Sequence, residues 1–85
     1  MSSVYRQAPG LRTDWFRILA DLRRLQIFDR MVARRVGVSK GTVNNWKRGT
    51  EPRHSDGERL IALWCEATHQ QRDAIPLIDP FDWRR

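Results

Sequence analysis

Apolar residues recur every three or four positions across residues 13–71, which is the spacing that gathers them on one face of a helix. The first helix is predicted to start at Thr13, whose hydroxyl is expected to cap the free amides of the first turn. Asp14 adds a negative charge near the positive helix end. The apolar face consists of Trp15, Ile18, Leu19, Leu22 and Leu25. No strong stop signal follows, and the helix is predicted to end near residues 26–28.

Two short helices joined by a tight turn are predicted over residues 29–36 and 39–48. Asp29 is a candidate cap for the first of them, and Ser39 for the second. Gly37 lies where a positive φ would close the first helix at little cost. The residues expected to face inward are Met31, Val32, Ala33, Val36, Val43 and Trp46.

A fourth helix is predicted to begin at Ser55, because Ser55-Asp56-Gly57-Glu58 fits the capping-box pattern. Its apolar surface consists of Leu60, Ile61, Leu63, Trp64 and Ala67. The helix is expected to end near His69 or Gln71. No alternating strand pattern stands out. The pattern as a whole predicts a small all-α domain of four to five helices.

The helical part is flanked by two segments of different character. Residues 1–12 contain Ser, Gly and Pro and are expected to form a flexible N-terminal arm. Residues 72–85 form a C-terminal tail that is unusually apolar. Two prolines predict that residues 75–85 of this tail are mostly extended or loop. This tail either packs on its own domain, residues 13–71, or contacts a second copy of the chain. Truncation after Gln71 is expected to leave the fold intact and to weaken oligomerisation.

The positive charge is unevenly distributed along the 85 residues. The net charge is +6, but residues 1–54 contain twelve Lys and Arg against four Asp and Glu, whereas residues 55–85 contain four against six. The excess of positive charge therefore lies on the part that holds the two short helices. Such polarity suits a polyanion such as DNA.

Several functional classes have no support in the composition. No apolar run approaches the roughly 18 residues of a membrane span, and the first residues lack the apolar centre of a signal peptide. The single Cys65 excludes an intramolecular disulfide framework and a multi-cysteine zinc site, and His54 and His69 are fifteen residues apart. No nucleophile–base pair, paired-carboxylate signature or glycine-rich phosphate loop is present. An intracellular protein without metal, cofactor or catalytic activity is therefore expected.

Residues 32–46 resemble the helix-turn-helix of the Cro/repressor class (XRE-like) of DNA-binding regulators. The matching residues are Ala33, Gly37, Val43 and Trp46, followed by Gly49 and Pro52. A weaker resemblance to phage CII-type transcriptional activators, which are similarly short and work as oligomers, lies in VGVSKGTVNNWKRGTEPRHS followed by LIALW. The resemblance implies a phage-like or prophage-like regulator of transcription, either repressor or activator, in the cytoplasm or nucleoid of a bacterial host.

Asp29 departs from the pattern of this class. The class often carries Gln at the start of the second helix, where it helps to bind a phosphate, whereas a carboxylate there would repel one. Arg30 or nearby backbone amides are expected to take over the phosphate contact.

In a helix-turn-helix the second helix of the motif lies in the major groove, and its early residues reach base edges. The base-contacting candidates are Lys40, Gly41, Asn44 and Asn45. Asn can pair with adenine and Lys can donate to guanine, although Lys40 could instead contact only phosphate and either Asn could be merely solvated. The phosphate-contacting candidates are Arg30, Arg34, Arg35, Ser39, Thr42, Lys47, Arg48 and Arg53. Trp46 is expected in the core rather than stacked on a base.

Double-stranded DNA and a second copy of the chain are therefore the expected partners. One helix contacts only a few base pairs, so a homo-oligomer is predicted, most simply a dimer, with a tetramer as the alternative. Two other functions stay open: a DNA-binding subunit of a recombination or antitoxin complex, and a protein-interaction adaptor that does not bind DNA.

Overall fold

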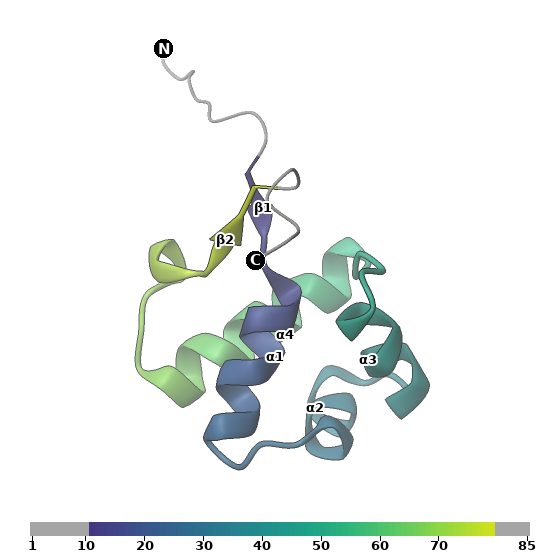
Figure 1. The fold of residues 1–85 in the computed structure, drawn as a ribbon. Coiled ribbons are helices and arrows are strands. Elements are labelled where there is room, and N and C mark those ends of the chain that lie inside the picture. The colour runs from purple at the N-terminus through teal and green to yellow at the C-terminus, as the bar shows by residue number, and fades with distance from the viewer. Residues whose placement is uncertain (1–10, 80–85) are drawn as a thin grey trace.

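The computed structural model describes residues 11–79, which form four α-helices, one 3-10 helix and a two-stranded ribbon (Figure 1). The helices are α1 (Trp15–Arg24), α2 (Asp29–Val36), α3 (Lys40–Lys47), α4 (His54–Thr68) and the 3-10 helix η2 (Arg72–Ala74). The strands are β1 (Arg12–Thr13) and β2 (Leu77–Ile78). The predicted all-α class is confirmed. No helix within residues 11–79 has both the length and the apolar content needed to cross a membrane.

The helices surround a single core. In Figure 1, α1 lies in front of α4, while α2 and α3 pack against one another beside this pair. Further contacts join α1 to α3 and α2 to α4, so each helix touches at least two others. The buried apolar side chains are Ile18, Leu19, Leu22, Val32, Ala33, Val36, Val43, Trp46, Leu60, Ile61, Leu63 and Trp64.

The cap of the first helix lies one residue later than predicted. Asp14, not Thr13, caps α1, because its Oδ1 accepts a hydrogen bond of 3.0 Å from the Arg17 amide. Thr13 belongs to β1 instead. Further along the helix, Asp21 Oδ2 accepts a hydrogen bond of 3.0 Å from Trp64 Nε1, which ties α1 to α4.

The turn between α2 and α3 forms as the sequence predicts. Gly37 has φ +91°, and the amides of Gly37 and Val38 donate to the Ala33 carbonyl at 2.8 and 2.9 Å. Ser39 then caps α3, because its Oγ accepts a hydrogen bond of 3.1 Å from the Thr42 amide. These local bonds set the direction in which α3 leaves the turn.

Two predictions about α2 are wrong. Asp29 is the first residue of the helix and not its cap. Phe28 occupies the cap position and makes no side-chain hydrogen bond there. Met31, expected to face inward, is 48% exposed. The helix buries only the stripe formed by Val32, Ala33 and Val36. Met31 precedes that stripe by one residue and is therefore rotated about 100° away from it.

The predicted capping box of α4 does not form. The helix begins at His54, and the preceding Arg53 makes no side-chain cap. Glu58 instead accepts hydrogen bonds of 2.8 and 2.7 Å from both terminal nitrogens of Arg72. This pairing lowers the pKa of Glu58 and raises that of Arg72. The C-terminal end agrees with the prediction, because His69 follows the last helical residue in the left-handed conformation.

Residues 72–79 pack back on their own domain. The 3-10 helix η2 lies against α4, and β2 pairs antiparallel with β1, with Arg12 opposite Ile78 and Thr13 opposite Leu77. The Asp14 amide donates to the Pro76 carbonyl at 2.9 Å, which joins the ribbon to the start of α1. The domain therefore extends past the predicted boundaries of 13–71, while most of the predicted arm and residues 80–85 lie outside the described residues.

We expect the substitution Gly37→Ala to lower the free energy of unfolding by about 1–2 kcal/mol, because a Cβ is strained at positive φ. Chemical denaturation followed by circular dichroism measures this change. Gly41→Ala is the matched control, since Gly41 has an ordinary φ and the nearest atom to an added Cβ is 3.8 Å away. Equal stability changes for the two variants would contradict the role of Gly37.

We also expect truncation after Gln71 to lower the free energy of unfolding by about 1–3 kcal/mol. The truncation removes the Glu58–Arg72 pair, the ribbon and the Ile75 side chain that packs on the core. Truncation after Asp79 keeps all of these contacts and serves as the control. An unchanged denaturation midpoint in the chain truncated after Gln71 would show that residues 72–79 contribute nothing to the fold.

Candidate nucleic-acid interface

The outer face of α3 is polar and has no partner within residues 11–79. Lys40, Gly41, Asn44 and Asn45 are all exposed, and their three- and four-residue spacing places them on one side of the helix. The side chains of Lys40, Asn44 and Asn45 make no hydrogen bond or ion pair to any described residue. The structure therefore brings the four predicted base-contacting residues together on a single surface.

The inner face of α3 fixes this orientation. Val43 is fully buried and Trp46 is 3% exposed, so both belong to the core. The prediction that Trp46 is a core residue is confirmed, and a buried indole cannot stack on a base. Because the two apolar side chains point inward, the four polar positions point out.

Four of the predicted phosphate-contacting residues are exposed cations without a carboxylate partner in the described part of the chain. Arg30 and Arg34 lie on α2, whereas Arg48 and Arg53 lie in the connection between α3 and α4. None of them takes part in an ion pair within residues 11–79. They flank α3 in the sequence on both sides.

The other predicted phosphate-contacting residues have partners inside the domain. Arg35 donates to Glu66 of α4 at 2.8 Å. The hydroxyls of Ser39 and Thr42 lie 3.0 Å apart, and Ser39 also caps the helix. Lys47 is bonded to Asp29. The presence of a partner inside the domain thus separates the eight predicted residues into two groups, a division that the sequence did not indicate.

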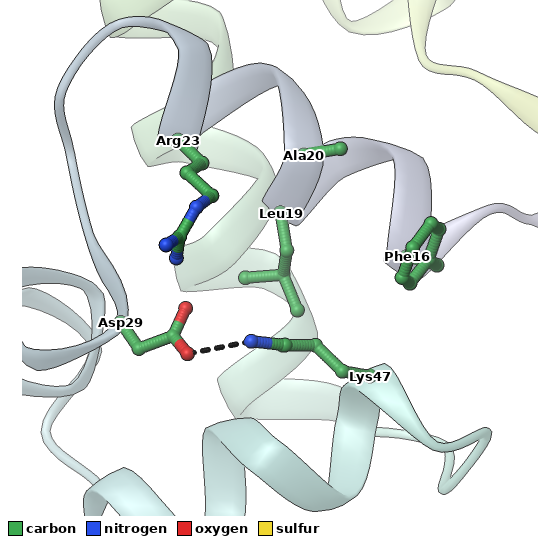
Figure 2. Close-up of a pocket in the computed structure, with 6 residues that line it drawn as sticks. All are labelled: Phe16, Leu19, Ala20, Arg23, Asp29 and Lys47. Carbon is green, nitrogen blue, oxygen red and sulfur yellow. Dashed lines mark hydrogen bonds and ion pairs between the residues drawn. The ribbon is translucent and has the colours of Figure 1, made fainter.

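The Asp29–Lys47 pair joins the first residue of α2 to the last residue of α3. Lys47 Nζ lies 2.7 Å from Asp29 Oδ2, and the two side chains are 31% and 16% exposed (Figure 2). The ammonium group of Lys47 therefore compensates the negative charge of Asp29 at the start of α2. The same contact draws Lys47 toward the domain.

Asp29 lines two hollows. One, of about 290 Å³, has an apolar wall from α1 formed by Phe16, Leu19 and Ala20 and a polar rim of Arg23, Asp29 and Lys47 (Figure 2). The other, of about 430 Å³, is lined by Arg23, Phe28, Asp29, Arg30 and Lys40.

Arg23 is the site residue that sequence reasoning missed. The helical pattern places it only off the apolar face of α1, and its neighbours on α2 and α3 depend on how the helices pack. No local sequence signal could have identified it.

No group of three His, Cys, Asp or Glu side chains that could hold a metal ion occurs within residues 11–79.

We expect a double-mutant cycle of Asp29→Ala and Lys47→Ala to give a coupling energy of about 0.5–1 kcal/mol. The pair is partly shielded from solvent, whereas Arg35 and Glu66 are 54% and 68% exposed and provide a control pair. The control cycle is expected to give about 0.3 kcal/mol or less. Chemical denaturation of the unmodified chain and the six variants measures both. A coupling no larger than that of the control would mean that the Asp29–Lys47 pair does not help to hold α2 and α3 together.

Comparison of the chain with protein-family models, curated proteins and solved structures found no match. The function is therefore inferred from the geometry described above.

Proposed function

We propose that the chain is a sequence-specific, double-stranded DNA-binding regulator of transcription that contacts bases with the outer face of α3. The observation that carries this proposal is the polar face of Lys40, Gly41, Asn44 and Asn45. It is exposed, free of bonds to the described residues, and held outward by the burial of Val43 and Trp46.

The dimensions and chemistry of α3 suit the major groove. An α-helix with its side chains is roughly 10–12 Å across, close to the major-groove width of about 12 Å. Asn44 and Asn45 have the donor and acceptor pair that matches adenine, and Gly41 allows close approach because it has no side chain. Lys40 lies in the first turn and can reach either a guanine or the backbone.

The charge of the surrounding residues supports binding to the phosphate backbone. Residues 29–53 contain seven Lys and Arg and two Asp and Glu. Arg30 and Arg34 precede α3, and Arg48 and Arg53 follow it. Such contacts raise affinity for every sequence and fix the register of the helix in the groove.

We further propose that two copies bind together. A single short helix contacts only a few base pairs, and regulators with this motif gain specificity from two half-sites about 34 Å apart. The proposed activity is binding alone, without catalysis or a cofactor.

Selection of bound duplexes from a random pool tests the function directly. We expect the enriched sequences to share a short motif that occurs twice, with symmetric halves spaced by about one helical turn. A single motif without symmetry would contradict the paired copies. Failure to retain duplex DNA at low salt would contradict the proposed function and favour an adaptor that does not bind DNA.

Substitutions then separate base contacts from backbone contacts. We expect Asn44→Ala with Asn45→Ala to reduce the preference for the selected motif over a scrambled duplex by about tenfold or more, because a bidentate base contact contributes roughly 1–3 kcal/mol of discrimination. Arg34→Ala with Arg48→Ala should instead weaken binding to both duplexes alike. Fluorescence anisotropy on the two duplexes measures both ratios. An unchanged base preference in the asparagine variant would show that other residues contact the bases.

A further inference from the structure

The hollow of about 430 Å³ beside the start of α2 gathers positive charge from three helices. Arg23 comes from the end of α1, Arg30 from α2 and Lys40 from α3, and Phe28 and Asp29 complete the lining. Only α3 and α2 belong to the helix-turn-helix, so Arg23 adds a cation from outside that motif.

The positive charge of this hollow is not balanced within the described chain. None of the three cations forms an ion pair with a carboxylate of residues 11–79. Asp29 is the one acidic residue in the lining, and it already shares its charge with Lys47 at 2.7 Å. The neighbourhood therefore keeps three positive charges in excess of that pair, and like charges around one hollow repel.

The positions of Arg30 and Lys40 add to this imbalance. Arg30 is the second residue of α2 and Lys40 is the first residue of α3. Both lie in the first turn, where the helix dipole favours anions and disfavours cations. The start of α2 also lacks a side-chain cap, because Phe28 provides no acceptor. An anion in the hollow would compensate both helix ends and the three side chains.

Arg23 is oriented by an aromatic ring. Its guanidinium carbon lies 5.2 Å from the centroid of the Phe28 ring, within the range of a cation–π contact. A guanidinium stacked in this way loses less freedom when it binds, and its planar set of donors matches two oxygens of a phosphate.

We propose that Arg23, Arg30 and Lys40 bind one backbone phosphate of duplex DNA in this hollow, with Phe28 orienting Arg23. The inference rests on the proposed function and deepens it in two ways. It adds a phosphate contact from α1, and it assigns Lys40 to the backbone, which leaves Gly41, Asn44 and Asn45 for the base edges.

The test compares binding of the full chain to the selected duplex and to a scrambled duplex over a series of salt concentrations. For Arg23→Gln with Lys40→Gln we expect affinity for both duplexes to fall about tenfold or more, and the log–log salt slope to fall by about 0.9, the value for one phosphate. The preference for the selected duplex should not change.

The control variant removes the same number of charges elsewhere. Arg24→Gln with Arg59→Gln removes two cations that are paired with Asp21 and Asp56, and neither lines the hollow. This variant should keep the salt slope of the unmodified chain. If both double variants lower the slope equally, the proposed phosphate site is wrong, although the DNA-binding function stands. If the unmodified chain shows no salt-dependent binding to either duplex, both proposals fail.

Phe28→Leu separates orientation from charge. All cations remain, so the salt slope should not change, but affinity should fall about two- to fivefold through loss of the cation–π contact. Arg23→Lys keeps the charge and loses the planar donors, and the same pattern is expected for it. Circular dichroism melts show whether each variant is folded. An altered base preference in Arg23→Gln with Lys40→Gln would overturn the assignment of Lys40 to the backbone.

Discussion

Burial of Val43 and Trp46 is the constraint on which the candidate interface depends. A short helix has a single buried stripe, and a buried Trp removes more apolar area from water than most other side chains. Once these two side chains enter the core, the polar positions of α3 have only one direction in which to point. The presentation of the polar face is thus a consequence of core packing, supported at the end of the helix by the contact between Lys47 and Asp29.

The segment around Gly37 is where sequence reasoning works best. A glycine at positive φ, a serine cap and an apolar spacing of three residues are all local signals, and the structure follows them closely. The existence of α1 and α4 could also be predicted, because their apolar spacing is regular. The exact start of α1 could not be predicted, because Thr13 and Asp14 are both good caps. The pairing of Thr13 with Leu77 leaves Asp14 as the cap.

The features that could not be predicted from the sequence depend on contacts between residues far apart in the chain. The ribbon has two residues in each strand, which is too short for any alternating pattern, and its strands come from opposite ends of the described chain. The arginines show the same limit, because a count of charges does not distinguish Arg35, which pairs with Glu66, from Arg34, which has no carboxylate partner in residues 11–79. The site around α3 is thus predictable in its composition, while the selection of cations that face outward is a property of the packed domain.

The ribbon also has a consequence for local opening of the fold. Pairing of Arg12 with Ile78 closes nearly all of the described residues into one loop, whereas the ladder itself offers few hydrogen bonds to offset the lost chain entropy. Such a pairing is expected to form after the helices have docked and to open before they separate. Through the bond from the Asp14 amide to the Pro76 carbonyl, opening would also loosen the first turn of α1. The least stable part of the domain is then the ribbon of β1 and β2 together with the first turn of α1. Its amide hydrogens can exchange with solvent while α2 and α3 keep their packing.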